Sequence, residues 1–158
     1  MDEVTEGQAK TVMELFCAFN GIEVPDDIEN DVIAVDIDGV PEIWISYLGD
    51  GGVEVYAEIE GIDVTDPGTL RLLLEANFMG MATEAARLSI NPVVDLVVLS
   101  ERWDYQRLLA EDALADLARF ARLVASWRSE GVAEIKSKKN DDGVEPTDDA
   151  PDMTILRL

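Results

Sequence analysis

The chain opens with a pattern that is typical of an amphipathic helix. Thr5 and Gln8 stand at the spacing of a capping box, in which each side chain satisfies a backbone N–H group at the start of the helix. Gly21 follows where a C-terminal cap is expected. Between them, apolar residues recur at the helical spacing of three or four positions, at Ala9, Val12, Met13, Phe16 and Phe19.

Three short segments after this helix predict β-strands. Residues 32–38 (VIAVDID) are rich in β-branched side chains and end in Asp38-Gly39, a frequent hairpin turn. Residues 43–48 (IWISYL) follow, and residues 53–60 (VEVYAEIE) alternate apolar and polar positions. The short connections favour an antiparallel meander with one buried face and one solvated face.

The second half of the chain repeats the change from helix to strands. A second helix is expected to end at Gly80, two further strands are predicted at 83–90 and 96–101, and a long helix at 110–129. The predicted order is therefore α-β-β-β-α-β-β-α. Because tight turns rather than helical crossovers join consecutive strands, the fold class is α+β, with a twisted antiparallel sheet packed against helices.

The second helix, at residues 70–80 (LRLLLEANFMG), is apolar on two sides. Its expected N-cap is Asp66 or Thr69. One face carries Leu70, Leu73, Leu74 and Asn77, while Leu72, Ala76 and Met79 cover much of the rest. A surface helix in so acidic a domain is expected to carry a wide polar face, so this helix needs something to cover its second apolar side.

The strand at residues 43–48 is also apolar on both faces. Trp44, Ser46 and Leu48 share one face, and Ile43, Ile45 and Tyr47 take the other. Either helices cover both sides of this strand, or one side is kept for a partner.

The charge of the chain excludes some classes of partner. The 158 residues include 34 acidic and 12 basic residues, a formal net charge of −22. Nucleic acids and anionic membranes need a basic surface, so neither is expected as a partner. No apolar segment of about 18 residues predicts membrane insertion. The acidity favours a basic or polar polypeptide partner, high solubility, or a halophilic proteome in which acidic surfaces are general.

Few residues offer catalytic or metal-binding chemistry. The chain has no histidine, which removes the most frequent general base and most zinc sites. Its single cysteine, Cys17, lies near the apolar stripe of the first helix, is interpreted as a small buried residue, and fits a reducing cytoplasm. Asp36 and Asp38 share a strand face and are a candidate pair for Mg²⁺ or Ca²⁺, although chance alone explains such a pair in this composition. No cofactor, metal or catalytic residue is expected, and the acidic residues 1–10 predict no signal peptide.

Residues 1–131 are predicted to form the folded domain, and residues 132–158 an acidic linker with an apolar tail. Residues 136–152 are charged, contain two prolines and show no periodicity, which is typical of a flexible linker. Residues 153–158 (MTILRL) are apolar and strand-like. One hypothesis is that they dock on a sheet edge or groove of this chain or of a neighbour. The alternative is that they have no functional contact.

Part of the sequence resembles a known family. The segments LRLLLEANFMG at 70–80, EAARLSINPVVDLVVLSERW at 84–103 and VASWRSE at 124–130 resemble the class I type III secretion chaperones, the Tir-chaperone family. The resemblance covers roughly residues 8–130 and is most specific in the middle helix and the β-turn-β that follows. The first helix and the first three strands match only in pattern, and the tail lies outside the resemblance.

This resemblance implies a bacterial cytoplasmic homodimer without enzymatic activity. Each dimer is expected to hold the N-terminal segment of a secreted effector in extended form before export. In such proteins the middle helix commonly forms the dimer interface together with strand four. The interface residues expected from the resemblance are Leu70, Leu73, Leu74, Asn77 and Met81. Because Asn77 is a polar residue at a mostly apolar contact, we expect it to set the register of that contact.

An effector-binding groove is expected between the first helix and one face of the first two strands, because strand addition and shallow apolar pockets suit an extended peptide. Its candidate residues are Val12, Met13, Phe16, Phe19, Val32, Ala34, Trp44 and Leu48. The alternative for most of them is ordinary core. Two other functions remain open: a dimeric regulator or adaptor of the same fold without a secretion role, and a small enzyme or metal-binding protein that uses Asp36 and Asp38.

Overall fold

The computed structural model describes residues 3–28, 30–48, 52–104 and 110–141. Along the chain its elements are α1 (Glu3–Asn20), β1 (Val32–Ile37), β2 (Val40–Tyr47), β3 (Val53–Ile59), α2 (Pro67–Ala76), the 3₁₀ turn η1 (Phe78–Gly80), β4 (Arg87–Asn91), β5 (Leu96–Trp103), α3 (Ala110–Ser126), the π-helical turn η2 (Trp127–Gly131) and α4 (Val132–Asp141). The predicted α+β class is confirmed, and the eight predicted elements occur in the predicted order.

The five strands form one antiparallel sheet in the order β1-β2-β3-β5-β4. The β1–β2 hairpin turns through Asp38 and Gly39, both at positive φ (51° and 80°), as an Asp-Gly pair allows at little cost. Strand β5 lies between β3 and β4, so β1 and β4 are the two edges of the sheet.

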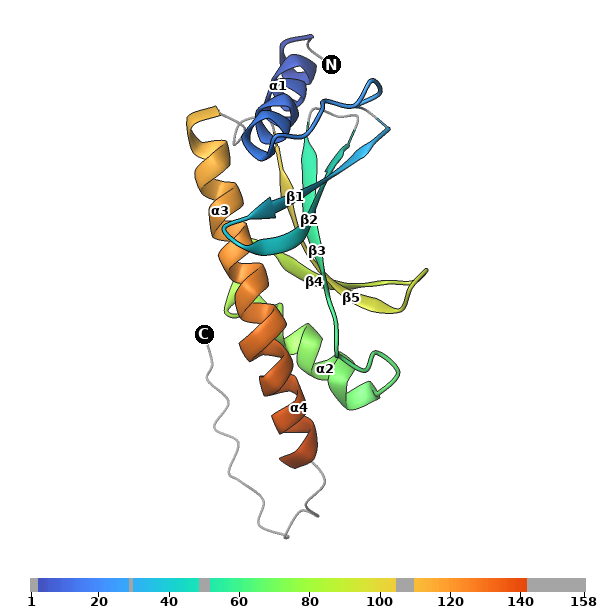
Figure 1. The fold of residues 1–158 in the computed structure, drawn as a ribbon. Helices are drawn as coiled ribbons and strands as arrows, with labels where there is room; N and C mark the ends of the chain where they lie inside the picture. Colours follow the sequence, from blue (N-terminus) through green and yellow to red (C-terminus); the bar gives the residue numbers. More distant parts are fainter. Residues whose placement is uncertain (1–2, 29, 49–51, 105–109, 142–158) are drawn as a thin grey trace, which may run out of the picture.

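The side chains of the sheet alternate between a buried face and a solvated face. On β1, Ile33, Val35 and Ile37 are buried while the residues between them are exposed. Helices α1 and α3 pack on the buried face (Figure 1). There the rings of Phe16 and Trp103 pack edge to face, with centroids 6.1 Å apart. One face of the sheet is therefore covered by helices and the other, the outer face, is left to solvent.

Helix α2 ends earlier than the sequence predicts. The side chain of Asp66 caps its start, accepting a hydrogen bond from the backbone N–H of Thr69 at 2.8 Å. Helical geometry stops at Ala76, and the chain then winds through η1 and further turns, so β4 begins at Arg87 rather than at Thr83. The apolar run continues past the end of the helix, which is why the pattern alone extended α2 to Gly80.

The last helix continues past the predicted domain boundary at residue 131. The π-helical turn joins α3 to α4, and Val132 and Ile135 of α4 are buried in the same core as the sheet. Helix α4 packs against α2 (Figure 1). The folded domain therefore includes residues 132–141, and the rest of the expected tail, residues 142–158, lies outside the described residues.

Candidate protein-binding site

Helix α2 and the edge strand β4 form an exposed apolar surface, called here the α2–β4 surface. It contains a shallow pocket of about 280 Å³, lined by Leu70, Leu73, Leu74, Asn77, Leu88, Ser89 and Ile90. Leu74 is 71% exposed, and the nearby Phe78 is also exposed. Clustered apolar side chains left in water mark an interaction site rather than a monomer surface. Four of the five residues expected at a dimer interface lie together here.

Asn77 ties the end of α2 to strand β4. Its amide nitrogen donates to the carbonyl of Leu88 at 3.0 Å, and its amide oxygen accepts the N–H of the same residue at 2.8 Å. The side chain thus occupies the backbone groups of an edge strand much as a neighbouring strand does. Because both polar groups of the amide are engaged within the chain, the structure gives Asn77 a positioning role inside the protomer.

Met81, the fifth expected interface residue, lies apart from the other four. Its side chain is 83% exposed and lines a second pocket together with Leu72 and Ala76, on a different face of α2. That pocket opens between α2 and the α3–α4 helix. The two apolar sides of α2 therefore face two different surfaces.

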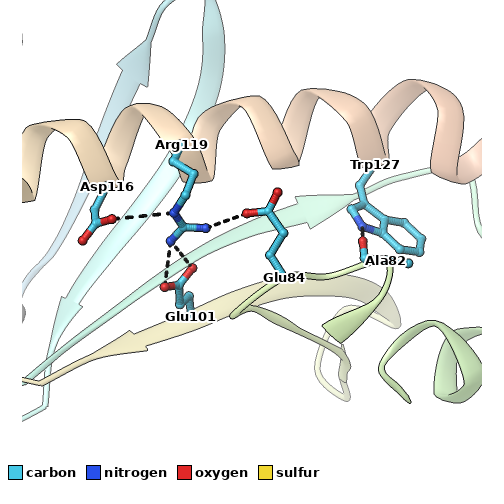
Figure 2. A network of polar contacts seen from close by, with 6 residues as sticks. All are labelled: Ala82, Glu84, Glu101, Asp116, Arg119 and Trp127. Atoms are coloured by element: carbon cyan, nitrogen blue, oxygen red, sulfur yellow. Dashed lines mark hydrogen bonds and ion pairs between the residues drawn. The ribbon is translucent and has the colours of Figure 1, made fainter. Parts of the chain in front are cut away.

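A buried ion pair anchors the segment between α2 and β4 to α3 (Figure 2). Glu101 of β5 is 1% exposed and accepts two hydrogen bonds from Arg119 of α3, at 2.7 and 2.8 Å. The same guanidinium donates to Glu84 at 3.0 Å and lies 3.6 Å from Asp116. Burial alone lowers the pKa of Arg119, but the hydrogen bonds and negative charges, those of Glu101 first, outweigh it and raise the pKa. The arginine therefore stays charged in a mostly buried position.

A second anchor lies about two turns further along the same helix (Figure 2). The indole Nε1 of Trp127 donates to the carbonyl of Ala82 at 2.9 Å. Between α2 and β4, Met79 and Glu84 both have φ of 53°, a left-handed conformation that disfavours non-glycine residues by about 1–2 kcal/mol. Such a backbone persists where surrounding contacts determine it. The two anchors thus fix the turns that expose Phe78 and Met81.

The structure divides the expected groove residues between the two faces of the sheet. Val12, Met13 and Phe16 are fully buried in the core beneath α1. Helix α1 packs on the face of β1 that carries Ile33 and Val35, so these three residues touch the core and not the outer face. They are therefore corrected from groove to core, the alternative that apolar periodicity left open.

The other expected groove residues are accessible. Val32, Ala34 and Trp44 lie on the outer face, Leu48 is half-buried just after β2, and Phe19 is exposed near the end of α1. The ring of Trp44 stacks on that of Tyr56 in the next strand, with centroids 6.4 Å apart and planes 16° from parallel. Burial, aided by the charge of Glu58, raises the pKa of Tyr56, which keeps the phenol neutral. This apolar strip runs across the outer face to the free edge of β1.

The acids singled out as a metal candidate make ordinary structural contacts. Oδ1 of Asp36 accepts the backbone N–H of Glu42 at 3.1 Å, and Asp38 occupies the hairpin turn. Throughout the described residues, no group of three or more His, Cys, Asp or Glu side chains is placed to hold a metal ion. Burial, together with the charge of Glu14, raises the pKa of the Cys17 thiol, which makes it a poor nucleophile. Over the same part of the chain, no helix has the length and hydropathy needed to cross a membrane.

Comparison with known proteins now identifies the family. The model of the Tir chaperone protein (CesT) family matches residues 12–128, which include every strand and helices α2 and α3. The chain belongs to the Tir chaperone protein (CesT) family. The resemblance seen in the sequence is thereby confirmed. Helix α4 of this CesT-family protein lies beyond the matched residues.

Solved structures agree with this fold. The structure titled ExsC–ExsE complex matches at 19% identity and a TM-score of 0.63, covering 81% of this chain and 95% of the other. The HopA1–SchA chaperone–effector complex matches at 14% identity and a TM-score of 0.60, covering 81% of this chain and 98% of the other. The ExoT–SpcS complex from Pseudomonas aeruginosa matches at 17% identity and 0.51, covering 78% and 96%. At such identities the likeness shows a common fold. No curated protein matches the sequence significantly.

Two important side chains of this CesT-family protein were missed from the sequence, Glu101 and Arg119. A signal was present, since Glu101 occupies the core-facing phase of β5 between Leu99 and Trp103. A carboxylate at such a position needs a cation or several hydrogen-bond donors. Strand alternation therefore indicated a buried ion pair but not which basic residue completes it.

Proposed function

We propose that this CesT-family protein is a type III secretion chaperone. As a homodimer in the bacterial cytoplasm, it binds the N-terminal segment of a secreted effector and keeps it soluble and export-competent, without a catalytic step. The observation that carries the proposal is the family match over residues 12–128. One of the similar structures is a chaperone–effector complex, which supports the same role.

The α2–β4 surface is the proposed dimer interface. A two-fold interface places the same patch of both subunits in contact, and an apolar helix beside a sheet edge is self-complementary in this sense. Leu74, Phe78 and Ile90 are the large exposed apolar residues here. Burying a leucine or phenylalanine side chain fully contributes about 1.5–3 kcal/mol, so a symmetric contact gains each contribution twice before the entropy of association is subtracted.

The outer face and the edge of β1 are the proposed effector site. The Trp44–Tyr56 stack and the exposed Val32 offer an apolar strip beside an open sheet edge. An extended peptide pairs its backbone with such an edge and places alternate side chains on the adjoining surface. The net charge of −22 favours and accelerates the approach of a basic segment.

The dimer is tested by Leu74→Glu in sedimentation equilibrium. We expect a dimeric parent and a monomeric variant, because two new carboxylates meet across the two-fold axis without a cation. Phe19→Glu is the matched control: it makes the same chemical change at another exposed site, on α1, and is expected to remain dimeric. A monomeric parent, or a Leu74→Glu variant that dimerises as tightly as the parent, contradicts the proposed interface.

The effector role is tested in the protein's own host under secreting conditions. The tagged chain is purified and its partner identified by mass spectrometry; the partner is then re-expressed without its N-terminal segment. We expect one dominant secreted protein whose capture requires that segment and is weakened by Trp44→Ala. Val93→Ala, at an exposed position in the β4–β5 turn, is expected to leave capture unchanged. Recovery of nothing but the chain's own dimer favours the adaptor function instead.

A further inference from the structure

A pocket lies between α2 and α4, away from both surfaces described above. Its volume is about 410 Å³, and its walls come from α2, residues 81–82, the π-helical turn and α4. The apolar part of its lining consists of Leu72, Ala76, Met81, Ala82, Trp127 and Ile135. Met81 remains largely exposed there. We call this hollow the α2–α4 pocket; one of its walls, α4, lies beyond the family match.

The rim of the α2–α4 pocket is acidic. Glu75, Glu130 and Glu134 line it with a single lysine, Lys138. The Nζ of Lys138 lies 2.6 Å from Glu134, and that hydrogen bond, with the charges of Glu134 and Glu75, raises the pKa of the lysine. Within the described residues no cation pairs with Glu130. The pocket is therefore suited to a short apolar segment that carries one positive charge.

The chain contains such a segment shortly after the pocket. Residues 153–158 read MTILRL: four apolar side chains and one arginine, Arg157. Residues 142–152 before it carry five acids and no base. The last two turns of α4 carry Lys136, Lys138 and Lys139. The acidic residues 142–152 are thus complementary in charge to the lysines at the end of α4. The apolar residues 153–158 are complementary in polarity to the apolar lining of the pocket.

The connection is long enough. The pocket-lining residues Glu134 to Lys138 lie three to seven positions before Asp141, the last residue of α4. At 1.5 Å per residue, the distance from Asp141 back to these residues is at most about 10 Å along the helix. The eleven residues 142–152 span up to about 35 Å when extended. We propose that residues 153–158 fold back and dock in the α2–α4 pocket of the same chain, with Arg157 beside Glu130. This docking does not depend on the proposed chaperone function, because it involves neither the α2–β4 surface nor the outer face.

Cysteine pairs test the docking in the full-length protein, whose one native cysteine is buried. Leu156→Cys combined with Met81→Cys is expected to form an intrachain disulfide under mild oxidation, identified by peptide mapping. Leu156→Cys with Leu74→Cys probes the α2–β4 surface, and Leu156→Cys with Val32→Cys probes the outer face; in neither pair is a disulfide to position 156 expected. Failure of the Met81 pair, or equally fast oxidation of either other pair, overturns the proposal. A disulfide between position 156 of one chain and position 81 of another overturns it as well, because the segment then docks on a neighbour.

Hydrogen exchange provides a second test without added cysteines. Ile155→Asp is expected to increase the amide exchange rate of residues 132–141 several-fold, because a charged side chain does not enter the apolar pocket. Val144→Asp makes the same kind of change in the linker and is expected to leave these rates unchanged. Equal exchange in the parent and in Ile155→Asp overturns the proposal. Both replacements leave every described core residue unchanged.

Discussion

Replacing Arg119 with methionine removes the guanidinium that pairs with the buried carboxylate of Glu101. The methionine retains much of the apolar stem, so the change removes mainly the charge and the hydrogen bonds. Four contacts are lost: two hydrogen bonds to Glu101, one to Glu84, and the ion pair with Asp116. The perturbation therefore releases both β5 and the segment before β4 from α3.

The magnitude follows from the burial of the two partners. Removing one partner of a buried ion pair typically costs about 3–5 kcal/mol of stability. An ordinary hydrogen bond contributes only about 0.5–1.5 kcal/mol. Glu101 is 1% exposed, but the side chain of Arg119 is 26% exposed, so water reaches part of the site. We therefore expect a loss near the lower end, about 3 kcal/mol. Arg71→Met, which breaks an exposed pair with Glu75, is expected to cost less than about 0.5 kcal/mol.

Urea unfolding followed by far-UV circular dichroism measures both losses. All variants are compared at one protomer concentration, because the stability of a dimer depends on concentration. The decisive variant is the double replacement Arg119→Met with Glu101→Gln, which removes the buried negative charge that Arg119 no longer balances. We expect it to be more stable than Arg119→Met alone. The reasoning is refuted if Arg119→Met loses less than about 1 kcal/mol, or if the second replacement destabilises it further.

Three further predictions concern the ends of helices. Gly131→Ala normally favours a helix by about 1 kcal/mol, but here the new Cβ meets the Trp127 ring at 2.5 Å, so thermal denaturation should show net destabilisation and Trp127 fluorescence should shift. Asn77→Ala should cost about 1–2 kcal/mol and increase hydrogen exchange at the N–H of Leu88, whereas Asn77→Asp should keep only the accepted bond. Hydrogen bonds from Thr69 lower the pKa of Asp66 in the folded protein. The stabilisation that this carboxylate provides is therefore present above its unfolded-state pKa and is lost as the pH falls through the folded-state pKa. Asp66→Asn should flatten that part of the pH–stability curve, and an unchanged curve contradicts this prediction.

The first three strands were predictable because their information is local. Alternation in β3 and the Asp38-Gly39 turn determine which residues pair and where the chain reverses. The end of α2 was not predictable in this way, since Asn77 bonds to Leu88, eleven positions away. The sequence pattern predicts a linker from residue 132 onward, because residues 136–152 are charged and show no periodicity. Residues 132–141 are helical because α3 continues into them and buries Val132 and Ile135.

Prediction of the candidate site from the sequence has the same limit: local pattern does not show which distant segments come into contact. Sequence pattern identified Leu70, Leu73 and Leu74 as an unusual apolar face, and the structure leaves part of that face open. It also identified apolar residues on α1 and on β2, but not that α1 packs on the opposite side of the sheet from Trp44. Periodicity tells which residues of one element share a face. Which face another element covers depends on contacts between segments that are distant in the sequence.

Helix α2 has only ten residues, too few to be stable alone in water. Its order therefore depends on what covers each of its two apolar sides. Leu72 and Ala76 face the pocket that α4 forms, while Leu70 and Leu74 line the surface proposed to meet the twin subunit. When one apolar side of α2 is covered, the helix is already more ordered. Covering its other side then costs less conformational entropy. Helix α4, beyond the family match, thus acts as a support for α2, and whatever fills the α2–α4 pocket strengthens the same helix that the proposed dimer requires.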